Sequence, residues 1–130
     1  LNCGITSILE KKCNHEIKSL SSTIHESIDE NADLILVFGA SAICDKNDVV
    51  PKSLKENNGK IIRLGMPVEP GNLMLLGEIK NASKIISFIG MPGCARSPKE
   101  NGVDWILWRI FCGLGVSNNN INYMGNGGLL

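Results

Sequence analysis

Short apolar runs that alternate with helical patterns limit the possible folds of this chain more than any other feature of its sequence. The clearest run, Leu34-Ile-Leu-Val-Phe38, is uninterrupted and ends at Gly39. Such a run predicts a strand that is covered on both faces, as in a parallel sheet. Before it, apolar residues recur at positions 17, 20, 24 and 28. This spacing predicts an amphipathic helix with Asn14 as its cap.

The same alternation continues along the rest of the chain. We expect further strands at 5–11, 60–64, 73–79 and 84–89, further helices at 51–57 and 104–114, and a polar turn at 118–122. Strands and helices that alternate in this way predict the α/β class with a mainly parallel sheet. A chain of 130 residues is long enough for one domain with a core of its own.

Composition and charge exclude several classes of function. Thirteen basic and thirteen acidic residues cancel, so the chain lacks the positive field of a general nucleic-acid binder. The apolar runs are too short to cross a membrane, and no export leader is evident at the start. Five scattered cysteines without a CxxC pair indicate reduced thiols, so we expect a cytoplasmic protein. His15 and His25 have no partner at metal-ligand spacing and are not predicted to bind a metal.

The loop from Gly39 to Asp48 is the first of three loops whose residue types suit a polar ligand. Its small residues let a backbone approach a phosphate closely, and Ser41 adds a hydroxyl group. Asp45 and Asp48 supply carboxylates that could hold a metal ion or orient a ligand. The alternative is an ordinary solvated loop in which Asp48 only caps the next helix.

Two later loops have related features. Residues 65–72 contain two prolines that stiffen the backbone and Gly71, which permits a tight turn. Residues 90–102 carry Arg96 and Lys99 near a predicted helix start, an arrangement that suits an anion. A surface loop with two solvated cations is the alternative for this third segment. In an open α/β sheet, loops at the carboxyl ends of strands bind ligands, so we expect all three to form one site.

Three stretches, in this order, resemble the molybdopterin-binding domain of molybdenum-cofactor biosynthesis proteins. They are Asp33–Pro51, Pro67–Leu73 and Met91–Trp105, and with the closing MGNGGLL they look like a subgroup associated with xanthine-dehydrogenase and carbon-monoxide-dehydrogenase type enzymes. That subgroup is often fused to a nucleotidyltransferase. The resemblance implies a three-layer α/β/α fold and one domain over residues 1–130 that lacks its first strand and most of its first helix.

The resemblance, taken with the chemistry of the loops, also implies a set of site residues. Asp48 and Glu16 would be the catalytic acids, and Asp48 would hold Mg²⁺. Ala40 stands where the family has a second glycine. The expected ligand contacts are Gly39, Ala40, Ser41, Asp45, Pro70, Gly71, Pro92, Gly93, Arg96, Ser97 and Lys99.

The function that the resemblance implies is binding of molybdopterin or molybdenum cofactor, a pterin phosphate, during cofactor maturation. It leaves open whether the chain is an enzyme, which would then catalyse nucleotidyl transfer or molybdenum insertion. The alternative is a non-catalytic assembly domain that docks a molybdoenzyme or a nucleotidyltransferase domain. A nucleotide ligand and a homo-oligomer are further expectations. A generic nucleotide-binding domain is disfavoured, because neither GxGxxG nor a phosphate-loop Gly-Lys-Ser/Thr motif is present.

Overall fold

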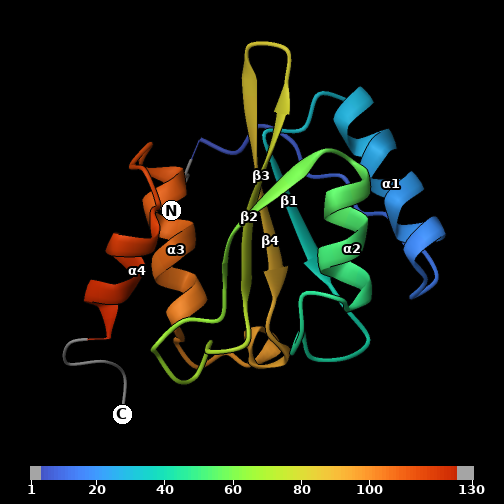
Figure 1. Cartoon of the computed structure of the whole chain (residues 1–130). Helices are drawn as coiled ribbons and strands as arrows, with labels where there is room; N and C mark the ends of the chain where they lie inside the picture. The colour runs from blue at the N-terminus through green and yellow to red at the C-terminus, as the bar shows by residue number, and fades with distance from the viewer. Residues whose placement is uncertain (1–3, 126–130) are drawn as a thin grey trace.

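The computed structural model describes residues 4–125 and confirms the α/β class (Figure 1). Within that range, none of the helices combines the length and apolarity that a bilayer crossing requires. The elements are α1 (Ile17–Asp29), β1 (Leu34–Phe38), α2 (Val49–Glu56), β2 (Gly59–Leu64), β3 (Leu75–Asn81), β4 (Lys84–Met91), the short 3₁₀ helix η1 (Gly93–Arg96), α3 (Gly102–Phe111) and α4 (Asn118–Met124).

The sheet is mixed, so the prediction of a mainly parallel sheet is wrong. The described residues form four strands in the order β1-β4-β3-β2. β1 is parallel to β4, whereas β4 pairs with β3 and β3 with β2 in antiparallel fashion. The reason lies in the connections. A parallel pair needs a long crossover, but β3 and β4 are joined by a tight turn at Ala82, whose φ is +53°, and β2 and β3 by residues 65–74 without a helix.

The prediction that both faces of β1 are covered is wrong, because Leu36 and Phe38 are 38% and 53% exposed. β1 is also an edge strand, with β4 as its neighbour on one side. The strand predicted at 5–11 is also wrong. Residues 5–14 form an extended arm with no strand pairing in the described chain, and Ile8 on this arm is 82% exposed. Apolar residues there find no neighbouring strand to pair with.

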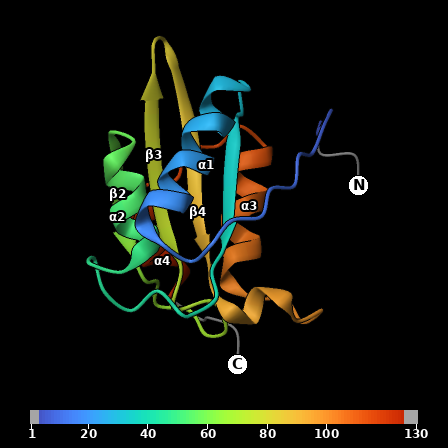
Figure 2. The same cartoon turned by 90° about the vertical axis from the view of Figure 1, so that its right-hand side faces the viewer.

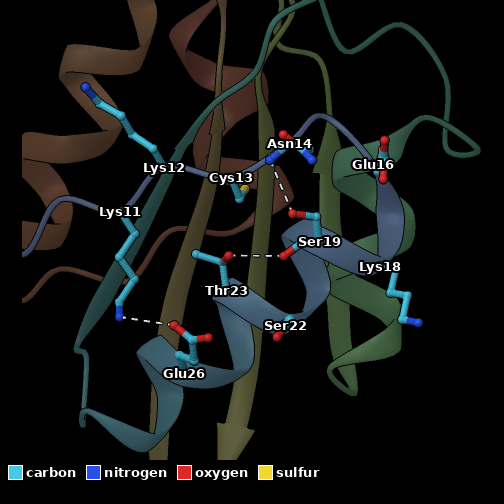
Figure 3. A pocket seen from close by; sticks show the side chains of 10 residues that line it. All are labelled: Lys11, Lys12, Cys13, Asn14, Glu16, Lys18, Ser19, Ser22, Thr23 and Glu26. Atoms are coloured by element: carbon cyan, nitrogen blue, oxygen red, sulfur yellow. Dashed lines mark hydrogen bonds and ion pairs between the residues drawn. The ribbon is translucent and has the colours of Figure 1, made fainter.

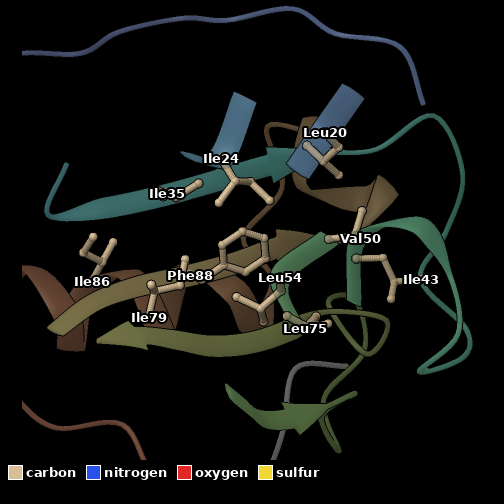
Figure 4. Close-up of a cluster of buried hydrophobic side chains, with 10 residues drawn as sticks. All are labelled: Leu20, Ile24, Ile35, Ile43, Val50, Leu54, Leu75, Ile79, Ile86 and Phe88. Carbon is tan, nitrogen blue, oxygen red and sulfur yellow. The ribbon is translucent and has the colours of Figure 1, made fainter. Parts of the chain in front are cut away.

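Helices pack on both faces of the sheet (Figures 1 and 2). On one face, Leu20 and Ile24 of α1 and Leu54 of α2 pack with sheet residues around the fully buried ring of Phe88 (Figure 4). On the other face, α3 and α4 form a second core with Leu76, Ile89 and Met91, among others. Each buried aliphatic or aromatic side chain of this kind contributes about 1.5–3 kcal/mol of transfer free energy.

The starts of helices α1, α3 and α4 differ from the predicted ones. Asn14 is not the cap of α1, because the helix begins two residues later than predicted, with Glu16 in the N-cap position. The predicted polar turn at 118–122 is helix α4, which a capping box between Ser117 and Asn120 starts and the buried Ile121 anchors. α3 begins at Gly102, two residues before the predicted start at 104, behind a capping box of Asn101 and Asp104. Residues 126–130 of the MGNGGLL stretch lie outside the described residues.

Candidate functional site

The three candidate loops lie at the same end of the sheet, where β1, β4 and β2 end. Phe38 at the end of β1 pairs with Met91 at the end of β4, so the loops that follow these parallel strands begin side by side. β3 runs opposite to β4, and β2 runs opposite to β3, so β2 ends where β1 and β4 end. The pairing of Leu64 with Leu75 therefore brings residues 65–74 to the same end of the sheet. Figure 1 shows all three loops at the bottom of the sheet. The strand register, rather than the loops themselves, sets this arrangement.

The first and third loops enclose a small hollow of about 120 Å³. They can do so because β1 and β4 are neighbours in the sheet. The lining consists mainly of small or conformationally restricted residues with one cation: Phe38, Gly39, Ala40, Ser41, Ala42, Met91, Pro92, Gly93 and Arg96. Of the eleven expected ligand contacts, this hollow therefore collects Gly39, Ala40, Ser41, Pro92, Gly93 and Arg96.

The chemistry of this hollow suits an anion. Arg96 is the single charged residue among the described residues that line it. A Cβ built on Gly93 would meet nothing within 4 Å, so the backbone there is open to a ligand. The Ser41 hydroxyl, on the opposite wall, can donate a hydrogen bond. A guanidinium together with a hydroxyl and exposed backbone is a combination that binds phosphate oxygens.

The second loop supports the site from outside the hollow. Pro70, which follows a cis peptide bond, accepts a hydrogen bond from the Gly102 amide at 2.8 Å. Gly71 has φ +115°, and a Cβ there would lie 2.8 Å from the Gly102 nitrogen. Pro70 and Gly71 therefore pack against the start of α3, directly after the third loop. In the described structure they hold that helix rather than line the hollow.

The carboxylate of Asp48 binds backbone amides of its own loop. One carboxylate oxygen, Oδ2, accepts hydrogen bonds from the Cys44 and Asp45 amides at 2.8 and 2.9 Å. The Asp45 and Cys44 amides hold the pKa of the Asp48 carboxyl below its usual value. Asp48 occupies the N-cap position of α2, but its side chain does not cap that helix. Asp45 is exposed and likewise binds its own loop, because its Oδ1 accepts a hydrogen bond from the Asn47 amide at 2.6 Å.

The remaining predicted site residues are not brought together with these groups. Glu16 is exposed at the N-terminus of α1, outside the hollow. Ser97 Oγ accepts from the Lys99 amide at 3.2 Å, and both residues are exposed beyond the hollow's lining. Residues 4–125 contain no cluster of three or more His, Cys, Asp or Glu side chains that could hold a metal ion. The predicted acidic residues Glu16, Asp45 and Asp48 are therefore not among the residues that line the hollow.

His15 was missed by the sequence reasoning. Its Nε2 lies 3.4 Å from Ser41 Oγ, and a Cβ built on Gly39 would lie 3.7 Å from its Cε1. The ring thus packs over the first loop, beside a residue that lines the hollow. No local pattern could have revealed this, because the contact joins residues 26 positions apart. It depends on the packing of α1 and α2 on the same face of the sheet.

A larger hollow of about 730 Å³ lies between the arm and α1 (Figure 3). All of its lining residues come from positions 11–26, so it is separate from the three loops. Lys11 is already paired there with Glu26 at 3.3 Å and Glu30 at 2.9 Å. The hydrogen bond that Lys11 donates to the Glu30 carboxylate raises the pKa of Lys11, and Glu26 makes a smaller contribution. Lys12, Glu16 and Lys18 point in different directions in Figure 3, so the polar groups of this hollow do not converge on a common point.

Comparison with known proteins adds no assignment. No protein-family model matches the chain, and no curated protein matches it significantly. The fold and the site define an α/β domain with a small hollow beside the carboxyl ends of β1 and β4, and Arg96 supplies the positive charge of this hollow.

Proposed function

We propose that this chain binds an anionic pterin phosphate, molybdopterin or the molybdenum cofactor, with the phosphate in the hollow between the first and third loops. The observation that carries the proposal is the convergence of small residues from both loops around Arg96. The chain has no net charge, so long-range attraction is weak and local groups must hold the phosphate. The resemblance of the same loops to molybdopterin-binding domains supplies the identity of the ligand.

The size of the hollow determines which part of the ligand enters it. Pockets that enclose a whole cofactor-sized ligand measure roughly 300–1,000 Å³. At about 120 Å³ the hollow accommodates a phosphate group but not a pterin ring system. Phe38 lines the hollow and is 53% exposed, so its ring offers a flat surface on which the pterin can stack. In this proposal the phosphate is buried and the rings lie across Phe38 at the rim.

The proposal favours a binding and delivery module over a transferase. Nucleotidyl transfer to a phosphate relies on metal ions held by carboxylates. Asp48, the proposed Mg²⁺ ligand, already accepts two backbone hydrogen bonds through one oxygen, and Glu16 lies outside the hollow. A transferase activity would need Asp48 to turn its carboxylate toward the phosphate.

The proposal includes the architecture of the domain. Helices on both faces of the sheet support the proposal of a three-layer α/β/α domain of the molybdopterin-binding type. The parallel β1–β4 pair carries the first and third loops, between which we propose that the phosphate binds. Cytoplasmic location, a homo-oligomeric state and a molybdoenzyme as recipient belong to the same proposal.

Direct binding measurements with two matched variants test the proposal. Arg96→Ala removes the cation of the hollow, whereas Lys99→Ala removes an exposed cation three residues away that lies outside it. A charge-assisted hydrogen bond contributes about 1.5–3 kcal/mol, so Arg96→Ala should weaken binding of the phosphorylated pterin roughly tenfold or more. Lys99→Ala should have a much smaller effect.

The dephosphorylated pterin provides the control for this experiment. It should bind Arg96→Ala and the parent protein equally, because it has no group for the guanidinium to hold. If Arg96→Ala binds the phosphorylated pterin as tightly as the parent does, the hollow is not the phosphate site and the proposal fails.

A second candidate, the non-catalytic docking domain, is favoured by one observation. β1 is an edge strand with exposed Leu36 and Phe38, and such edges are surfaces on which other chains pair. Under this alternative, Leu36→Lys would abolish association with a molybdoenzyme subunit or a nucleotidyltransferase domain. Arg96→Ala would then change neither that association nor the co-purification of any pterin.

A further inference from the structure

His15 is held in place from both sides of the chain. Before it, Lys11 is paired with α1, and the Asn14 amide donates to Ser19 Oγ at 3.2 Å. After it, the helix α1 begins, and the Glu16 amide donates to the Asn14 carbonyl at 2.8 Å. These contacts fix the end of the arm against α1, as Figure 3 shows for Asn14, Ser19 and Lys11. The backbone that carries His15 is therefore tied to α1 on both sides of the residue.

The contact that His15 makes is with a wall of the hollow rather than with its interior. Nε2 faces Ser41 Oγ at 3.4 Å, whereas His15 is not among the described residues that line the hollow. Ser41 belongs to both environments, because it lines the hollow and meets the imidazole. A serine hydroxyl rotates freely unless a partner fixes it, and here the partner is a ring nitrogen.

We infer that His15 is a positioning residue that orients the Ser41 hydroxyl toward an anion in the hollow. The inference rests on the proposed function, and it adds a residue to that site. When Nε2 carries a proton, it donates to Ser41 Oγ, and the hydroxyl proton is left to point at an anion oxygen. When Nε2 is unprotonated, it accepts the Ser41 proton, and the hydroxyl turns away from the hollow.

The carboxylate of Asp48 also lies near this contact. His15 contributes to the lowered pKa of the Asp48 carboxyl, after the Asp45 and Cys44 amides. Asp48 belongs to the same loop as Ser41, so the imidazole and the first loop meet through charge as well as through the Ser41 hydroxyl.

The competing explanation is that His15 merely packs over Gly39. Three variants separate the two explanations. His15→Gln places an amide nitrogen close to the position of Nε2 and can still hold Ser41. His15→Phe keeps a flat ring over Gly39 but cannot form a hydrogen bond. His25→Gln changes the other histidine, which is exposed on α1 and pairs with Asp29 at 3.7 Å, and serves as the control.

The test is an NMR titration of the full chain with inorganic sulfate, an anion that does not change its charge between pH 5 and 8. Backbone amides of residues 39–42 and 92–97 report binding in the hollow, and the spectrum itself shows that each variant is folded. Losing one oriented hydroxyl should weaken sulfate binding about two- to tenfold. We expect this loss in His15→Phe, but neither in His15→Gln nor in the His25→Gln control.

The double variant shows whether His15 acts through Ser41. If it does, Ser41→Ala combined with His15→Phe binds sulfate no more weakly than Ser41→Ala alone, because the second change has nothing left to remove. The inference is overturned if His15→Phe binds like the parent, or if the losses of the two single variants add in full. In both cases Arg96→Ala still weakens binding when the proposed anion site is correct. If Arg96→Ala has no effect, or the parent binds no sulfate, the proposed function fails as well.

Discussion

Replacing Gly71 by alanine should destabilise the whole domain, because this glycine lies where the second loop packs against α3. Its φ of +115° is a conformation that side chains with a Cβ rarely adopt. The new Cβ would also lie 2.8 Å from the Gly102 nitrogen and 3.2 Å from its Cα, both backbone atoms that cannot rotate away. Relieving that overlap disturbs the hydrogen bond from Gly102 to Pro70. Backbone strain and overpacking each cost about 1–3 kcal/mol, so we expect a loss of about 2–5 kcal/mol.

Urea unfolding, followed by the fluorescence of Trp105 and Trp108 on α3, measures this loss. With a slope of about 2 kcal/mol per molar urea, the midpoint of Gly71→Ala should fall by about 1–2.5 M. Gly93→Ala is the matched control in the third loop, because its φ is not positive and a Cβ there meets nothing within 4 Å. It should change stability by less than about 0.5 kcal/mol. Equal midpoints for Gly71→Ala and the parent would refute the packing of the second loop on α3.

Three further changes test other parts of the structure. Leu54 is fully buried, so Leu54→Ala should lower the free energy of unfolding by about 3–5 kcal/mol in urea, whereas Leu64→Ala, at a 36% exposed position, should cost far less. Asn101 caps α3, because its Oδ1 accepts a hydrogen bond from the Val103 amide, and Asn101→Ala should lower the free energy of unfolding by about 1–2 kcal/mol in the same assay. An unchanged urea midpoint would exclude this stabilising role of the cap. Two backbone amides of its own loop lower the pKa of Asp48, so its stabilisation is complete above the unfolded-state value of 3.8 and is lost as the pH falls through the lower folded-state value. The free energy of unfolding of Asp48→Asn should therefore fall less steeply than that of the parent below about pH 4, and parallel pH profiles would contradict this.

The elements with a strong period or a continuous apolar run were predicted well from the sequence. The pattern of α1 and the run of β1 each produced an element at the expected place, as did the segments that became α2 and β2. Their patterns are local, and the packing of the sheet agrees with them. The same was not true of the arm, whose apolar residues at 5–11 have β-propensity but no strand beside them.

Strand direction and position in the sheet depend on information that a local pattern lacks. The hairpin of β3 and β4 turns at Ala82, a residue type that rarely signals a turn with positive φ. Without that signal, alternation favoured a parallel sheet. The apolar run of β1 likewise predicts a strand that is covered on both faces, yet Leu36 and Phe38 are exposed. Which parts of a strand are covered depends on the helices and strands that pack beside it, and these are not encoded in the run itself.

For the candidate site, sequence reasoning predicted the loops better than the roles of their residues. Gly39, Gly93 and Arg96 were expected to be near one another, and the structure places them around one hollow. The expected contacts of Gly71 and Lys99 with the ligand have no counterpart in that hollow's lining. Residue types could indicate which loops suit an anion, but only the strand register shows which of them face each other.

The most direct test of the central claim is native mass spectrometry of the chain after expression in cells that make molybdopterin. We expect the parent protein to carry a bound species with the mass of molybdopterin or the molybdenum cofactor, and Arg96→Ala to carry much less of it at equal yield of folded protein. Lys99→Ala should retain it. A parent protein that carries no pterin under these conditions, or an Arg96→Ala variant that carries as much as the parent, would contradict the account.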